Sequence, residues 1–156
     1  MSFTHLDESG HARMVDVTGK QPTVRAASAR AFVTMAPDTV AALRDGAVPK
    51  GDVLAVARIA GIQAAKRTAE LLPLAHVIGV HGVVVDLRVQ DAGVSITATV
   101  RTADRTGVEM EALTAVTVAA LSVVDMVKGI DRTVTITDAC ITAKEGGRSG
   151  SWTRAE

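Results

Sequence analysis

Two stretches in the middle of the chain alternate between apolar and polar residues, with Val84 as the one exception. The first runs over residues 83–90 and the second over residues 94–101, with Asp91-Ala92-Gly93 between them. A period of two is typical of strands that bury one face, and a short connection containing glycine is typical of a hairpin. The pattern therefore predicts an antiparallel β-hairpin.

The segment from Gly107 to Ile130 has a different pattern, because it is apolar or small through its middle and charged only at its ends. This pattern predicts a helix with apolar residues nearly all round, which is typical of a helix packed against other elements. Its charged residues are Glu109, Glu111, Asp125 and Lys128. We expect Asp125 to be buried and paired with Lys128, which lies three residues further along the helix.

The other elements are delimited by proline, glycine and capping residues. They are a strand over residues 29–35, a short helix from Pro37 to Gly46, a long helix over residues 53–71 and a last strand over residues 133–143. Asp52 is a good N-cap for the long helix, and Pro73 stands where it should stop.

The resulting order is strand, helices, strand, strand, helix, strand. This order predicts an α+β fold of the ferredoxin-like, split βαβ type, with an antiparallel sheet and helices packed on one face. We expect one domain over residues 1–156, with a flexible N-terminal arm over residues 1–22 and a glycine-rich basic tail over residues 144–156.

Composition excludes several classes of function. The 156 residues carry a formal net charge of zero and only 2% aromatic residues, which argues against a nucleic-acid partner. The single cysteine, Cys140, cannot form an internal disulfide, and the polar N-terminus has no apolar segment of a signal peptide. The longest charge-free run of the apolar helix, residues 112–124, is too short to span a membrane. We therefore expect a cytoplasmic protein without a membrane partner.

The two ends of the apolar helix are far apart. An α-helix rises about 1.5 Å per residue, so Glu111 and Asp125 are separated by about 21 Å along the axis, although they lie on nearly the same face. Glu109 points roughly the opposite way. If Glu111 and Asp125 act on one small substrate, one of them must come from another subunit. This spacing predicts a site shared across an oligomer interface.

Some of these charges also have a purely structural interpretation. Thr106 and Glu109 have the spacing of a capping box, and Lys128 at the end of the helix suits the helix dipole. Asp125 is harder to explain in this way. A carboxylate paired with an ammonium group inside a protein has a pKa open to tuning, which suits general acid–base catalysis.

Three further segments are candidates for binding or catalysis. Lys50 stands beside the start of the long helix, where backbone N–H groups favour an anion, although the segment could equally be a capped helix start. The loop from Lys144 through Arg148 to Gly150 could wrap a phosphate or could be a mobile linker. His76 lies in a loop and could be an acid, a base or a ligand. A zinc site is not expected, because no third ligand has metal spacing.

Several runs together resemble a known family. They are Met14–Val17, Lys50–Asp52, Ala57–Thr68, Gly107–Ala115 and Asp125–Lys128. These runs are similar to the MoaC family of molybdenum-cofactor (molybdopterin) biosynthesis, and the resemblance covers nearly the whole chain.

The resemblance implies a ferredoxin-like subunit in a homo-hexamer, a trimer of dimers with active sites between subunits. It also implies a lyase reaction, the activity of a cyclic pyranopterin monophosphate synthase. The substrate is (8S)-3′,8-cyclo-7,8-dihydroguanosine 5′-triphosphate, which a radical SAM cyclase makes from GTP, and the products are cyclic pyranopterin monophosphate and pyrophosphate. No cofactor is implied, although a divalent ion such as Mg²⁺ could accompany the triphosphate.

Site residues follow from the same resemblance. It implies that Asp125 is the active-site aspartate, with Lys128 as its catalytic neighbour and His76 as a third proton carrier. The residues implied to bind substrate are Leu74, Ala75, His76, Glu109, Met110, Glu111, Lys50, Lys144 and Arg148.

One motif departs from the family pattern. The family commonly has Pro-Leu-Cys-His-Pro around the histidine, whereas this chain has Pro73-Leu-Ala-His-Val77. The thiol is absent at Ala75, and the loop lacks the stiffness of a second proline. The alternatives to an active synthase are a catalytically weakened paralogue and a ferredoxin-like regulator that binds a nucleotide without turnover.

Overall fold

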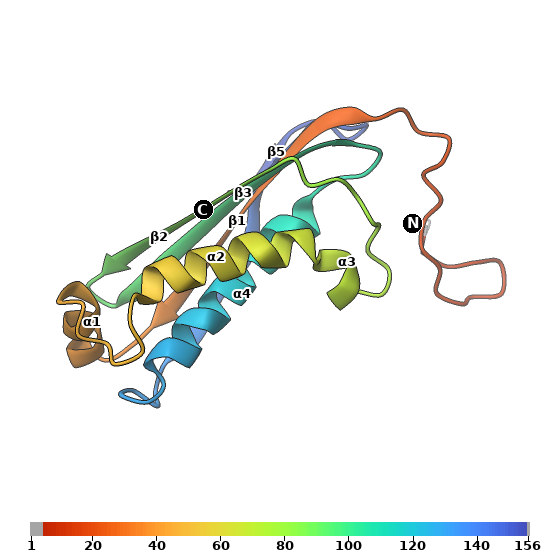
Figure 1. Cartoon of the computed structure of the whole chain (residues 1–156). Coiled ribbons are helices and arrows are strands. Elements are labelled where there is room, and N and C mark those ends of the chain that lie inside the picture. The colour runs from red at the N-terminus through yellow and green to blue at the C-terminus, as the bar shows by residue number, and fades with distance from the viewer. Residues whose placement is uncertain (1–4, 156) are drawn as a thin grey trace.

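The computed structural model describes residues 5–155. Its strands form one antiparallel sheet in the order β2-β3-β1-β4-β5, and Figure 1 shows α2 and α4 side by side across one face of that sheet. The strands are β1 (Thr23–Thr34), β2 (Gly82–Gln90), β3 (Gly93–Asp104), β4 (Thr135–Glu145) and β5 (Trp152–Thr153). The helices are α1 (Pro37–Arg44), α2 (Val53–Lys66), α3 (Thr68–Leu71) and α4 (Glu109–Val127). The predicted α+β class and antiparallel sheet are confirmed.

The predicted hairpin is β2 and β3, joined by Asp91 and Ala92. Val83 pairs with Val100 and Val89 pairs with Val94, so the apolar positions of the two strands lie opposite each other. Strand β1 begins six residues earlier than expected, at Thr23 rather than residue 29. It pairs with β3 along its whole length, and much of its buried face is alanine, which gives a weak strand signal in the sequence.

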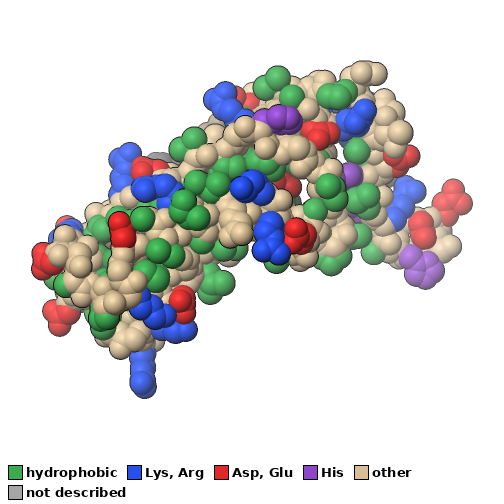
Figure 2. Space-filling view, viewed as in Figure 1, with side chains coloured by type: hydrophobic (Ala, Val, Ile, Leu, Met, Phe, Trp, Pro, Cys, Tyr) green, Lys and Arg blue, Asp and Glu red, His purple; other side chains and the backbone are tan. Residues whose placement is uncertain are grey.

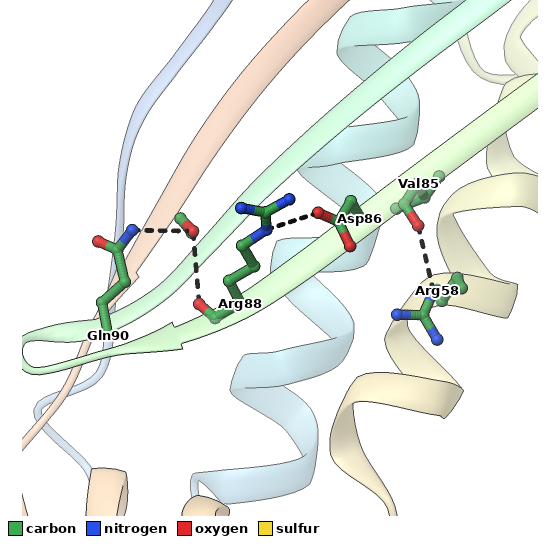
Figure 3. A network of polar contacts seen from close by, with 6 residues as sticks. Arg58, Val85, Asp86, Arg88 and Gln90 are labelled. Carbon is green, nitrogen blue, oxygen red and sulfur yellow. Dashed lines mark hydrogen bonds and ion pairs between the residues drawn. The ribbon is translucent and has the colours of Figure 1, made fainter.

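Side chains cover the free edge of the sheet at β2 (Figure 3). Arg58 of α2 donates from Nε to the backbone carbonyl of Val85 over 3.1 Å, and Arg88 pairs with Asp86 over 2.8 Å. An unpaired strand edge is a template for adding another chain, and charged side chains hinder that addition. These contacts therefore protect the edge strand from pairing with a second strand.

The helix predicted over residues 53–71 begins at Val53 and ends at Leu71 as expected, but it is divided into α2 and α3. The chain breaks at Arg67, and the buried hydroxyl of Thr68 donates to the backbone carbonyls of Ala64 and Ala65. Such bonds compete with the regular helical pattern, which explains the break. The predicted N-cap is confirmed, because Asp52 Oδ1 accepts the backbone N–H of Ala55 over 3.0 Å.

Helix α4 is the core helix of the fold. Its inner face consists of small residues, and it contacts α2 and the strands β1, β3 and β4. A Cβ atom added at Gly61 of α2 would lie 2.9 Å from the carbonyl oxygen of Ala115. The two helices are therefore packed too closely there for any larger residue. By length and composition alone α4 could cross a membrane, but its packing is that of a buried helix.

Asp131 ties the end of α4 to the start of α1. Its carboxylate is 6% exposed and accepts hydrogen bonds from the backbone N–H of Ala36 (2.8 Å), from the hydroxyl (2.7 Å) and N–H (2.8 Å) of Thr133, and from Thr39 (3.2 Å). These bonds, chiefly that from Ala36, lower the pKa of Asp131 from 3.8 to about 2. The ionised carboxylate therefore stabilises the folded chain.

Asp131→Asn is expected to lower the free energy of unfolding by about 2 kcal/mol at neutral pH, because that is the free energy linked to the lowered pKa. The folded-state pKa is depressed, so this contribution is present above the ordinary carboxyl value of 3.8 and is lost as the pH falls towards about 2. Urea unfolding over this pH range measures it, with the exposed Asp45→Asn as the matched control. Equal losses in the two variants would contradict the assignment.

Candidate functional site

A cavity of about 450 Å³ lies at the N-terminal end of α4. It is bounded by that helix end, by the loop between α3 and β2, and by the N-terminal arm, which we define here as residues 5–22. Its lining residues are His5, Val15, Val17, Lys20, Leu74, Ala75, His76, Thr106, Gly107, Glu109, Met110 and Glu111. Both segments that the resemblance assigned to substrate binding, Leu74–His76 and Glu109–Glu111, therefore line one cavity.

The acidic groups of this cavity differ in burial. Glu111 is only 4% exposed, and its burial raises the pKa of its carboxyl group. The negative charge of the nearby Glu109 raises this pKa further, whereas His76 lowers it. A raised pKa favours the protonated form of the carboxyl group, which suits a general acid.

Glu109 does not cap the helix, contrary to one interpretation of the sequence. The N-cap residue is Val108 and has no side-chain cap, so the predicted capping box with Thr106 is wrong. The carboxylate of Glu109 instead lies over Gly107, where any Cβ atom would collide with it, and 4.0 Å from Lys144 Nζ. Glu109 and Glu111 both line this cavity, at the first turn of the helix.

A second, basic cavity of about 530 Å³ adjoins the first, and Lys20 lines both. Arg148 and Arg25 also line it, and none of its lining residues within 5–155 carries a carboxylate side chain. The guanidinium of Arg25 is held by the backbone carbonyls of Asp104 (3.1 Å) and Arg105 (3.3 Å). Sequence analysis identified Arg148 but missed Lys20 and Arg25, because neither belongs to a recognisable local motif.

The other end of α4 carries a separate cluster, which we call the lysine–aspartate cluster and define as Lys50, Asp125 and Lys128. Asp125 accepts from Lys128 Nζ over 2.7 Å and from Lys50 Nζ over 3.1 Å, and Lys50 also donates to the backbone carbonyl of Asp125 over 2.8 Å. These bonds, first that from Lys128 and then that from Lys50, lower the pKa of Asp125.

The expectation that Asp125 is buried is wrong. Its side chain is 55% exposed, because it lies on the outer face of α4, away from the sheet. The predicted pair with Lys128 is present, and Lys50 joins it from the segment before α2. A solvent-facing cluster of two ammonium groups and one carboxylate is suited to meet an anionic ligand.

The candidate residues thus form two groups at opposite ends of one helix. Among residues 5–155, no set of three or more His, Cys, Asp or Glu side chains is arranged to hold a metal ion. The first group offers a protonatable carboxyl and an imidazole, and the second offers two ammonium groups around a carboxylate. Within one chain the two groups are kept apart, because Glu111 and Asp125 lie 14 positions apart in the same helix.

The groups assembled here suit proton transfer and the binding of an anion. Comparison with known proteins is more specific, because the model of the MoaC family matches residues 14–147. The chain therefore belongs to the MoaC family.

Curated relatives resemble the chain over nearly its full length. A cyclic pyranopterin monophosphate synthase of Streptomyces coelicolor is 62% identical over 98% of this chain and 90% of the relative. Proteins of the same name from Nocardioides sp. (57% identical over 97% of this chain and 95% of the relative) and Geobacter metallireducens (55% over 100% and 99%) are also similar.

Proposed function

We propose that this protein is a cyclic pyranopterin monophosphate synthase. It converts (8S)-3′,8-cyclo-7,8-dihydroguanosine 5′-triphosphate into cyclic pyranopterin monophosphate and pyrophosphate, an early step of molybdenum-cofactor biosynthesis and a lyase reaction. The observation that carries this proposal is the 62% identity to a protein of that name over 98% of the chain. The two groups of side chains on α4 supply the types of chemistry that the reaction needs.

The proton transfers of the rearrangement are assigned to groups from both ends of α4. Opening the purine-derived ring and closing the pterin ring require protons to be given and taken several times, for which His76, Glu111, Asp125 and Lys128 are the carriers. Lys50 and Lys128 hold Asp125 ionised, in accord with the lowered pKa of Asp125. Glu111, whose pKa burial raises, is the group suited to donate a proton.

The basic cavity is assigned to the phosphate groups. Expulsion of pyrophosphate places charge on phosphate oxygens, and cations fixed around those oxygens stabilise it. Lys20, Arg25 and Arg148 line that cavity, and Lys144 lies at its border beside Ser149. A divalent ion such as Mg²⁺ travelling with the triphosphate is compatible with this assignment, and the chain itself is proposed to hold no metal or cofactor.

We also propose that the subunit has ferredoxin-like topology and forms a homo-hexamer. The order β2-β3-β1-β4 with two helical crossovers supports the topology. Oligomerisation is supported by apolar residues on the outer face of the helix layer, namely Ile59, Leu71 and Leu121, which are 65%, 57% and 58% exposed. Figure 2 shows hydrophobic side chains interspersed with Lys and Arg over the face that carries α2. In the proposed hexamer, opposite ends of α4 from two different subunits come together.

We place the protein in the cytoplasm, beside the cyclase that supplies its substrate.

A coupled assay tests the proposed activity. The purified protein is incubated with the radical SAM cyclase, GTP and SAM, and the oxidised pterin is read by its fluorescence. Pterin formation that disappears in Asp125→Asn is the expected result. Consumption of GTP by the cyclase without pterin formation would overturn the proposal in favour of a weakened paralogue or a nucleotide-binding regulator.

A further inference from the structure

The N-terminal arm forms one wall of the first cavity. His5, Val15, Val17 and Lys20 all line it. The outer part of the arm is folded on itself, because Leu6 and Ala12 form an antiparallel bridge and the carboxylate of Asp7 accepts two backbone N–H groups. The outer part of the arm therefore has a defined backbone conformation.

The arm meets His76 through a backbone carbonyl. His76 Nε2 lies 2.6 Å from the carbonyl oxygen of Val15, 61 residues away in the sequence. A carbonyl oxygen only accepts hydrogen bonds, so Nε2 must carry a proton for this contact to be attractive. A neutral imidazole carries one proton, and the contact therefore selects the tautomer that is protonated at Nε2.

This selection leaves Nδ1 as the nitrogen that gains and loses a proton. Within residues 5–155, Nδ1 of His76 has no hydrogen-bond partner, whereas Nε2 is occupied by Val15. The other titratable groups that line the cavity are His5 and Lys20 from the arm and Glu109 and Glu111 from α4. None of them forms a hydrogen bond with the His76 ring among the residues that the structure describes.

We infer that the arm is a positioning element of the active site, in which the backbone carbonyl of Val15 fixes the proton of His76 on Nε2 and reserves Nδ1 for the reaction. The catalytic meaning of this inference rests on the proposed function, but the protonation state of the ring does not. Val15 acts here through its main chain, so its side chain is not needed for the effect.

NMR of the full-length protein labelled with ¹⁵N in histidine tests the inference directly. At about pH 9, where histidine rings are neutral, the His76 ring is expected to be protonated at Nε2, with an Nε2 proton slow enough in exchange to be observed. His76→Gln assigns the signals. A His76 ring protonated at Nδ1 would overturn the inference without any variant of the arm.

Two variants then test the role of the arm. Deletion of residues 1–16 removes the carbonyl and is expected to abolish the protected Nε2 proton and to lower kcat by about 100-fold, the lower range for general acid–base catalysis. Met14→Ala changes an exposed side chain of the arm that is not among the lining residues of the cavity and keeps the carbonyl of Val15. It is expected to retain both the signal and a rate within about 3-fold of the parent, since surface substitutions have small effects.

The outcomes separate this inference from the proposed function. Unchanged His76 ring signals in the deletion variant, with its amide spectrum still that of a folded protein, would overturn the positioning role. The expected ring signals in a full-length protein that makes no pterin would support the placement of the proton and overturn the proposed function.

Discussion

Lys128→Ala is expected to lower kcat by between about 100-fold and 10,000-fold, the range for loss of a group that transfers protons. Lys128 and Lys50 both bond to Asp125, so removing one ammonium group changes the charge and the orientation of the carboxylate as well. Exposed ion pairs contribute little to stability, and both side chains of the Lys128–Asp125 pair are more than half exposed. The melting temperature should therefore stay close to that of the parent protein.

The combination of lost turnover and retained stability is what distinguishes a catalytic role from a structural one. Single-turnover pterin formation and thermal unfolding of the same preparation measure the two quantities. Arg44→Ala is the control, because Arg44 forms an exposed ion pair with Asp91 and is not among the residues of the first cavity, the basic cavity or the lysine–aspartate cluster. Near-normal turnover in Lys128→Ala would remove this residue from the mechanism.

A mixture of two inactive variants is expected to recover activity. Asp125→Asn and Glu111→Gln damage opposite ends of α4, and each should be inactive alone. If a site combines one end from each of two subunits, random reassembly of equal amounts restores about a quarter of the sites, since each intact end is supplied half of the time. Turnover after dissociation and joint refolding, compared with each variant treated in the same way, measures the recovery.

The control for this experiment mixes two variants of the same end. Asp125→Asn and Lys128→Ala damage one cluster within one chain, so no combination of their subunits contains an intact lysine–aspartate cluster, and no recovery is expected. Recovery in this control, or none in the first mixture, would argue against a site built from opposite ends of two α4 helices.

Local patterns in the sequence predicted much of the fold. The hairpin followed from the alternation of apolar and polar residues, and the start of α2 followed from Asp52, because both signals depend on residues close together in the chain. The break at Arg67 was not predicted. It accompanies bonds from the Thr68 hydroxyl to carbonyls three and four residues earlier, and a threonine in a helical pattern does not by itself show that its side chain will make such bonds.

The candidate site was predicted in its residues more than in its arrangement. Asp125 was expected in the core because α4 is apolar nearly all round, but the alanines and valines on the buried side of α4 leave Asp125 exposed. Lys50 was identified at a helix start, whereas its bond to Asp125 joins residues 75 positions apart. The same holds for His76 and Val15, and no local signal predicts contacts of that range.

The number of residues between Glu111 and Asp125 in α4 can change little without disturbing the site. Because both groups of site residues are carried by one continuous helix, a single inserted residue would rotate one group against the other by about 100°. A complete extra turn would return the two groups to the same face of the helix, but it would increase the distance between them by about 5.4 Å. Insertions and deletions tolerated in the loops should therefore be absent between Glu111 and Asp125, and natural length variation in this protein should collect outside α4.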